Sequence, residues 1–217
     1  MTMTRKYYLI AMFLLAAALV ATVVAYPQLP ASVPMHWDIH NRVNGYGPKW
    51  TLFLFGPGLM AGMMVLFLFL PWLSPRQFEV DSFRETSLYI MLTIVSLMAY
   101  IHGVVLWASL GHAINVGRAA VGGVSLLFAL LGNVLGKVRR NFYIGVRTPW
   151  ALANERVWNA THRFAGKMFV LAGVIGLALT AIGVEGWLPL AALMVGPILP
   201  VVYSLVFYKH LERRGEL

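Results

Sequence analysis

Histidine and aspartate alternate in a polar stretch near the N-terminal end of the chain. His36, Asp38 and His40 stand two residues apart, so in an extended strand their side chains would share one face. Imidazole and carboxylate groups are good zinc ligands, which makes these three residues weak candidates for a metal site. The pattern lacks a fixed further ligand. We therefore expect no metal and no cofactor, and we expect a histidine and a tryptophan to pack this stretch onto neighbouring helix ends.

A second polar stretch, residues 137–167, sets many cationic side chains against a single acid, Glu155. Thr148-Pro149 is typical of a helix start, because threonine caps helices and proline suits the first helical position. A helix is expected to run from Pro149 straight into a membrane span. It would first lie at the cytoplasmic interface, with its tryptophans in the headgroup layer. The cationic residues are Lys137, Arg139, Arg140, Arg147, Arg156, Arg163 and Lys167.

Two interpretations of this stretch stay open. Its basic residues could simply meet anionic lipid and set the topology. Asn141, Arg147, Trp158 and His162 are more specific residue types than lipid contact requires. An Arg147 guanidinium could hold backbone carbonyls or a carboxylate. His162 could bond near Asn154 or Trp158, or act as a pH-sensitive contact.

Signatures of enzymes are missing from the sequence. There is no Gly-X-Ser-X-Gly, no His-Glu-X-X-His and no glycine-rich phosphate loop. The chain has no cysteine, which excludes disulfides and thiolate chemistry. We expect a non-enzymatic protein. The alternatives are a small transporter or channel, supported by Asn115, Asn133, His102 and Glu185, and, more remotely, a metal-dependent membrane enzyme.

Long uncharged runs make up most of the chain. Of its 217 residues, 59% are hydrophobic and 12% are charged, whereas a soluble domain has roughly 25% charged residues. A membrane span needs about 20 apolar residues. The sequence predicts an all-α, polytopic, single-domain membrane protein with six transmembrane helices and an interfacial helix before the fifth. The predicted spans are 6–26, 50–73, 87–110, 115–136, 165–185 and 187–208.

The loops and the glycines of the spans add three expectations. A very short turn at Gly111-His112 predicts that the third and fourth spans form an antiparallel hairpin. Glycines in the fourth and fifth spans favour close helix packing. Prolines and Asn-Gly turns make residues 27–50 extended and compact.

Basic residues also predict the orientation, because they gather in cytoplasmic loops. With the N-terminus inside, only Arg42, Lys49 and Arg118 of the 17 lysines and arginines fall outside. Both termini are therefore expected in the cytoplasm, with the chain crossing the membrane several times. The net charge of +9 is explained by this bias rather than by direct nucleic-acid binding.

Two motifs resemble those of a known family. The first resembles a domain of unknown function, DUF1648, and consists of Pro34-X-His36-Trp37 followed by Asn44-Gly45-Tyr46-Gly47-Pro48-Lys49. The second resembles the signature of the SdpI immunity family of bacterial membrane proteins. It consists of Asn141-X-X-X-Gly145-X-Arg147-Thr148-Pro149 and Trp158-X-X-Thr161-His162-Arg163-X-X-Gly166. The first motif departs from the family pattern where Asn41 replaces a glycine and Asn44 replaces an acid, although asparagine tolerates the same left-handed conformation.

The resemblance implies a function and a division of the chain. Residues 1–73 would form the DUF1648-like region, 74–136 the third and fourth spans, and 137–217 the SdpI-like part. The protein would confer immunity against a secreted antimicrobial peptide and, as a second role, hold a transcriptional repressor at the membrane. The implied partners are membrane lipid, a secreted toxin peptide and a cytoplasmic repressor. The peptide would arrive near the first motif, and the second motif would be the cytoplasmic docking face.

Overall fold

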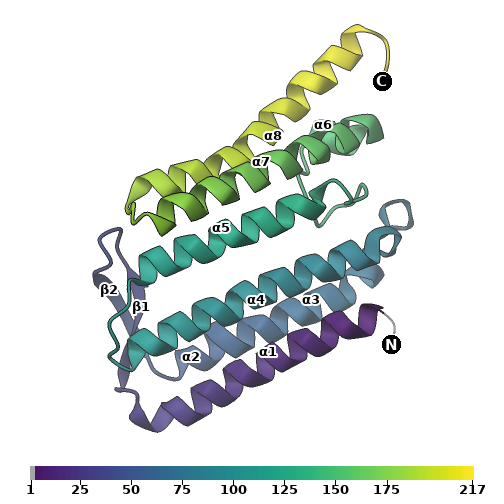
Figure 1. Ribbon diagram of the computed structural model, residues 1–217. Coiled ribbons are helices and arrows are strands. Elements are labelled where there is room, and N and C mark those ends of the chain that lie inside the picture. The colour runs from purple at the N-terminus through teal and green to yellow at the C-terminus, as the bar shows by residue number, and fades with distance from the viewer. Residues whose placement is uncertain (1–2) are drawn as a thin grey trace.

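The computed structural model describes residues 3–217. Six long helices lie side by side, and a small β-hairpin crosses one end of them (Figure 1). Within the described residues, six helices are long and apolar enough to cross a membrane, which confirms the prediction of an all-α polytopic membrane protein. The long helices are α1 (Met3–Ala25), α3 (Leu59–Leu73), α4 (Arg84–Ser109), α5 (Val116–Leu135), α7 (Glu155–Ala181) and α8 (Trp187–Arg213).

Helix α3 is the longer part of an interrupted span. The short helix α2 (Thr51–Phe53) passes through a π-helical turn, Leu54–Gly58, into α3. Pro57 lies inside that turn. Proline has no N–H to donate and its ring clashes with the carbonyl four residues earlier, so the helix widens here by a local π-bulge. The remaining helix is α6 (Pro149–Ala153), and short 3-10 turns lie at Tyr26–Gln28, Arg76–Phe78 and Val80–Phe83.

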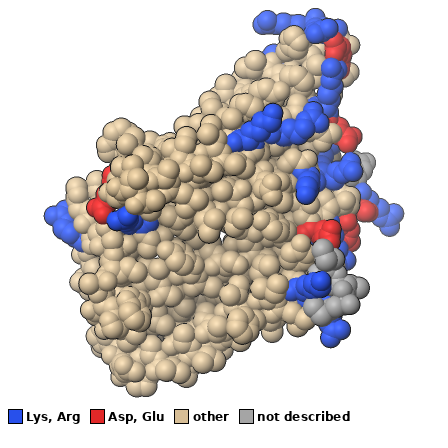
Figure 2. Space-filling view, viewed as in Figure 1, with Lys and Arg blue, Asp and Glu red and all other residues tan. Residues whose placement is uncertain are grey.

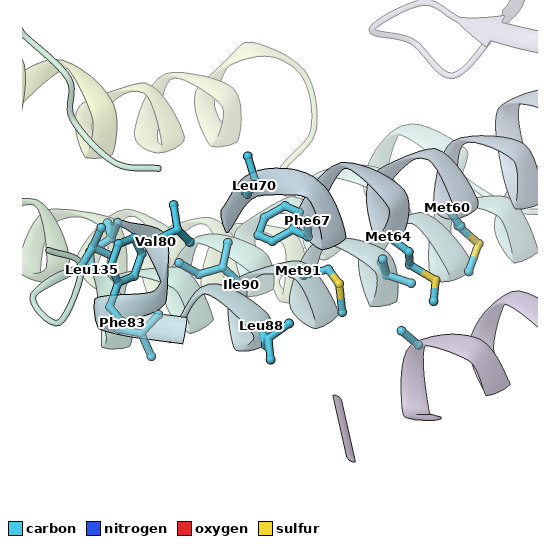
Figure 3. Close-up of a cluster of buried hydrophobic side chains, with 14 of the residues drawn as sticks. Met60, Met64, Phe67, Leu70, Val80, Phe83, Leu88, Ile90, Met91 and Leu135 are labelled. Carbon is cyan, nitrogen blue, oxygen red and sulfur yellow. The ribbon is translucent and has the colours of Figure 1, made fainter. Parts of the chain in front are cut away.

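The main apolar core lies where α1, α3 and α4 pack together, and it extends to the end of α5. Figure 3 shows Met64 and Phe67 of α3 beside Met91 and Ile90 of α4. A smaller cluster, which includes Leu29, Val33 and Leu52, lies under the hairpin. Helices α4 and α5 are antiparallel neighbours joined by a short turn, as the sequence predicted.

Helices α5 and α7 approach each other closely through glycines. A Cβ added at Gly132 would lie 2.7 Å from the Gly166 carbonyl oxygen, and one added at Gly173 would lie 2.5 Å from the Ser125 carbonyl oxygen. Helices that lack a hydrophobic driving force in lipid associate through such small residues. The packing role predicted for the glycines is therefore confirmed at this crossing.

Strands β1 (Ser32–Trp37) and β2 (Val43–Pro48) pair in antiparallel fashion. The sequence predicted an extended, compact stretch here but no strand pairing. Asn41 lies in the connecting turn with a φ of 60°, which confirms that asparagine takes the left-handed conformation there. The backbone of the turn closes with a hydrogen bond from Asn41 N to Asp38 O of 3.0 Å.

Both termini lie at the end of the bundle opposite the hairpin (Figure 1). Lysine and arginine gather at this same end in the space-filling view (Figure 2). We call it the basic end, formed by residues 74–83, the loop 136–148 and the two chain termini, and the other the hairpin end. The predicted clustering of cations with the termini is present in the fold.

The helix expected from Pro149 straight into the fifth span is wrong. Helix α6 ends at Ala153, and Asn154 has extended backbone angles, φ −138° and ψ 129°. Its side-chain oxygen accepts hydrogen bonds from Arg156 N at 2.8 Å and Val157 N at 3.2 Å. Asparagine side chains compete with the helical backbone in this way and favour caps. A helix of five residues therefore precedes a newly capped α7.

Candidate functional site

Asn141 organises the irregular loop that joins α5 to α6. Its side chain is fully buried. The amide nitrogen donates to Arg139 O at 2.8 Å and to Ile144 O at 3.0 Å, while the oxygen accepts from Tyr143 N and Ile144 N, both at 2.7 Å. Both donors and both lone pairs of the amide are thus used. Asn141 acts as a brace that substitutes for regular secondary structure in the loop.

Trp158 and His162 form an aromatic pair in the first turns of α7. Their ring centroids are 3.9 Å apart and the rings are stacked. Both side chains are buried, at 0% and 1% exposure. Trp158 Nε1 donates to Val138 O at 2.8 Å and so fastens the start of the loop to α7. The tryptophan therefore packs inside the protein, where the sequence predicted contact with lipid headgroups, because the loop folds over it.

His162 fastens the other side of the loop. Its Nδ1 lies 2.9 Å from Trp158 O, and its Nε2 accepts from Val146 N at 3.0 Å. A carbonyl can only accept and a backbone N–H can only donate. These two contacts therefore require a neutral imidazole with its proton on Nδ1. The prediction that His162 bonds in the Trp158 region is confirmed.

Gly145 is the position at which the loop backbone meets the imidazole. Its φ is +109°, and a Cβ there would lie 2.1 Å from His162 Nε2. Any side chain would suffer both an unfavourable backbone conformation and a collision with the ring. The glycine is needed so that the next residue, Val146, can direct its N–H at His162.

Thr148 caps α6 as predicted, with Pro149 at the first helical position. Its Oγ1 accepts from Ala151 N at 3.2 Å and donates to Ser204 Oγ at 2.8 Å. The Ser204 hydroxyl in turn donates to Val201 O. The loop is thereby tied to α8. Sequence reasoning missed Ser204, since a single serine in an apolar helix carries no pattern of its own.

The arginines of this region lie on the surface. Arg147 Nη1 donates to Phe142 O at 2.6 Å, which agrees with the predicted capture of a backbone carbonyl. Arg140 donates to Leu152 O and its guanidinium lies 5.1 Å from the centre of the Phe78 ring. Arg163 is exposed on α7, one turn before Gly166 at the α5–α7 crossing.

The second motif thus divides into two groups with different environments. One is a frame that fixes the loop against α7 and α8. It is made of the exposed Gly145 and of four residues with buried side chains, Asn141, Thr148, Trp158 and His162. The other is an exposed cationic surface made of Arg139, Arg147 and Arg163. Beside the frame lies a groove of about 490 Å³, bordered by loop residues 144–148 and by helices α4, α5, α7 and α8.

Exposed ion pairs hold the end of the chain near this region. Arg156 Nη1 lies 2.6 Å from Glu216 Oε2, and Arg214 Nε lies 2.7 Å from Glu216 Oε1. The hydrogen bond from Arg156, followed by the charge of Arg214, holds the pKa of Glu216 below its ordinary value. Such exposed pairs contribute little stability, but they place the last residues beside the first turn of α7.

The residues of the first motif build the hairpin end. Lys49 Nζ donates to Tyr26 O at 3.0 Å and Leu29 O at 3.3 Å, in the 3-10 turn that follows α1 and just after it. Gly45 faces His36 across the hairpin, and a Cβ there would lie 2.9 Å from His36 Cβ. Pro34 and Trp37 lie in β1, and Trp37 borders a pocket of about 220 Å³.

The weak metal candidates do not gather. Strand β1 ends at Trp37, so Asp38 and His40 lie in the turn and do not share a strand face with His36. The Asp38 carboxylate accepts from Arg42 N, His40 N and Arg42 Nε, each at 2.9 Å. The Arg42 backbone N–H contributes most to holding the pKa of Asp38 below its ordinary value. Among residues 3–217 no three His, Asp or Glu side chains lie close enough to hold a metal ion.

The polar residues considered for a transport path are spread along the bundle. Asn115 Nδ2 donates to Glu185 Oε1 at 2.6 Å at the hairpin end, where Asn115 also caps α5. Asn133 is exposed near the other end of α5. His102 is buried and lies 2.7 Å from Thr22 Oγ1. Asn115 and Glu185 thus meet at one pocket at the hairpin end, whereas Asn133 and His102 border two other pockets.

Comparisons with known proteins agree with the motifs. Residues 137–204 match the model of the SdpI/YfhL protein family, and residues 13–61 match DUF1648, a domain of unknown function. The chain is 27% identical over 171 residues to "Immunity protein SdpI" of Bacillus subtilis (strain 168), which covers 78% of this chain and 79% of the relative. No solved structure matches the chain. The protein is therefore a multi-pass membrane protein that is similar to the SdpI/YfhL protein family over residues 137–204 and to DUF1648 over residues 13–61.

Proposed function

We propose that this protein is a non-enzymatic membrane immunity protein that protects a bacterium from a secreted antimicrobial peptide. The similarity to the immunity protein of Bacillus subtilis carries the proposal, because it spans 78% of this chain. The two motifs lie within the regions that match DUF1648 and the SdpI/YfhL family. The frame adds support. Residues that only set topology need no buried partners, whereas Asn141, Trp158 and His162 are buried and fully bonded.

The distribution of charge supports one orientation in the membrane. The basic end, with both termini, would face the cytoplasm of a bacterial cell and the hairpin end would face outward across the inner membrane. A secreted peptide would then arrive at the hairpin and at the pocket beside Trp37. The cationic surface of Arg139, Arg147 and Arg163 would be open to a cytoplasmic partner.

Recruitment of a repressor is the second part of the proposal. Its support is the contrast between the rigid frame and the exposed groups that the frame displays, namely Arg147 and the half-exposed ring of Phe142. A cation beside an aromatic side chain suits a protein partner with acidic and apolar groups. This partner would dock on the cytoplasmic face without contacting the hairpin.

Immunity is tested by expressing the protein in a bacterium that the peptide kills and measuring survival at increasing peptide dose. We expect the wild type to raise the lethal dose. Arg147→Ala and His162→Ala should lose this protection while still reaching the membrane, as judged by immunoblots of membrane fractions. If the wild type protects against none of the candidate peptides, immunity is not the function of this protein.

Two matched variants test whether the protein needs the hydrogen bond to His162 and whether it needs the arginine of the motif in particular. His162→Gln should retain more protection than His162→Ala, because a glutamine oxygen can accept the Val146 N–H that alanine would leave unpaired, at a cost of about 1–3 kcal/mol. Arg84→Ala removes an exposed arginine at the same end but outside the motif and should behave like wild type. If Arg147→Ala and His162→Ala both protect fully, the motif has only a topological role.

A further inference from the structure

His102 is a buried polar side chain within the membrane-spanning part of the bundle, and the proposed function does not use it. It lies on α4 with 6% exposure. Thr22 Oγ1 of α1, itself fully buried, lies 2.7 Å from His102 Nε2. Polar groups at this depth are costly to bury and are usually retained for a function.

The contact with Thr22 determines which nitrogen of the His102 ring carries the proton. Thr22 Oγ1 donates its single hydrogen to Ala18 O at 2.8 Å. The hydroxyl can therefore only accept from His102, which requires the proton on Nε2. A neutral imidazole carries one N–H, so Nδ1 presents a bare lone pair. The described residues provide no hydrogen-bond partner for this atom.

Nδ1 lies beside Gly56, and His102 and Gly56 both border a groove. A Cβ added at Gly56 would be 2.1 Å from His102 Nδ1, so the glycine of the π-helical turn makes room for the ring. The groove has a volume of about 530 Å³ and lies between α2–α3 and α4, with Met35 of β1 in its lining. The rest of the lining is apolar, and Phe55 and Leu59 at its edge are 55% and 46% exposed.

We propose that this groove binds an uncharged long-chain amphiphile from the membrane, whose hydroxyl group donates a hydrogen bond to His102 Nδ1. The apolar lining accepts a hydrocarbon chain, and the single acceptor selects a ligand with a single donor. Without a charged side chain in the lining, a charged headgroup would be buried without compensation.

Other occupants fit the groove less well. A peptide segment would bring several backbone N–H and C=O groups, which cannot be left unpaired in an apolar setting. A water molecule needs two to four polar partners, and the lining side chains offer one. A hydroxyl on a hydrocarbon chain satisfies the acceptor and leaves nothing else unpaired.

The test uses the full-length protein in nanodiscs of phosphatidylcholine and three photoactivatable hexadecyl probes: the alcohol, its methyl ether and the alkane. Mass spectrometry of the digested protein locates and quantifies the labels. Residues bordering the groove should take up about three to ten times more alcohol than ether or alkane, the range that one net hydrogen bond supplies. The ether is the decisive control, because it has an oxygen but no donor.

Two variants assign the preference to His102. His102→Phe fills the same space, lacks the acceptor and leaves the Thr22 hydroxyl bonded to Ala18, so it should label equally with all three probes. His112→Phe changes a histidine that is stacked on Trp107 outside the groove and should keep the preference for the alcohol. If His102→Phe does not fold, the contrast between alcohol and ether in the wild type decides alone.

Three results would overturn the proposal: equal labelling of the wild-type groove by alcohol and ether, a preference that persists in folded His102→Phe, or no label in the groove. The last result would mean that a peptide or a second copy of the chain covers it. None of these measurements depends on immunity, so their failure and the failure of the proposed function are distinguishable.

Discussion

The absence of a side chain at Gly145 lets the His162 ring pack directly against the loop backbone. The histidine ring occupies the place where any other residue at 145 would carry its Cβ. The ring can then accept from Val146 N while it bonds within α7. Both nitrogens of the imidazole are committed to the protein. His162 therefore supports the loop and has no lone pair or proton left for an external partner.

Gly145→Ala should lower the thermal unfolding midpoint of the purified protein and reduce the protection it gives. The substitution adds the strain of a positive φ, about 1–2 kcal/mol, and drives the new methyl group into His162. Gly111→Ala is the matched control, because Gly111 has a φ of +88° and nothing within 4 Å of its Cβ position. If both variants unfold at the same temperature, the contact between Gly145 and His162 does not matter for stability.

Among the elements, helices α5 and α7 position the loop 136–148, which we call the signature loop. The close crossing at Gly132 and Gly166 lies just beyond the two aromatic residues of α7, so a small displacement of α7 would move Trp158 and His162 relative to the loop. The loop itself begins where α5 ends, at Leu135. Packing within the membrane is thus coupled directly to the geometry of the frame.

Gly166→Ala should destabilise the protein by about 1–3 kcal/mol, because the added methyl group would lie 2.7 Å from the Gly132 carbonyl oxygen and overpack the crossing. Gly103→Ala is the control. It also lies within a helix but has nothing within 4 Å of its Cβ position, and alanine favours helix there by up to about 1 kcal/mol. Thermal unfolding in detergent should move in opposite directions for the two variants. A midpoint for Gly166→Ala at or above wild type would contradict the close packing.

At the scale of the molecule, the two motifs lie at opposite ends of the bundle. The hairpin of the DUF1648 region is joined to the second half of the chain by Asn41, which donates to Ile114 O and accepts from Gly117 N, both at 3.3 Å. These contacts connect the outer loop to the start of α5, the helix that leads to the signature loop. A peptide bound at the hairpin could therefore act on the other end through α5.

The orientation can be measured directly, since the chain has no cysteine of its own. Tyr46→Cys on the hairpin should react with a membrane-impermeant maleimide in intact cells. Ser82→Cys in the loop before α4 should react only after the membrane is opened. Both residues are exposed in the fold, so access to the reagent alone decides the outcome. Reaction of Ser82→Cys, but not Tyr46→Cys, in intact cells would reverse the topology.

Much of this architecture could be predicted from the sequence because its causes are local. Length and hydropathy gave the six spans, Thr148-Pro149 gave a helix start, and the basic residues gave a common end for both termini. The β-hairpin and the break at Asn154 were missed. Strand pairing and capping depend on which backbone groups find partners, and proline, glycine and asparagine permit several outcomes.

The sequence by itself determined which residues of the signature are unusual, since residue type and spacing are visible without a fold. Only the tertiary structure decided that Asn141, Trp158 and His162 are buried braces while Arg147 lies at the surface. It also decided that His102 meets Thr22 and Gly56, residues far away along the chain. The physical reason is that burial and hydrogen-bond partnership arise from contacts between separate helices. No local pattern records those contacts.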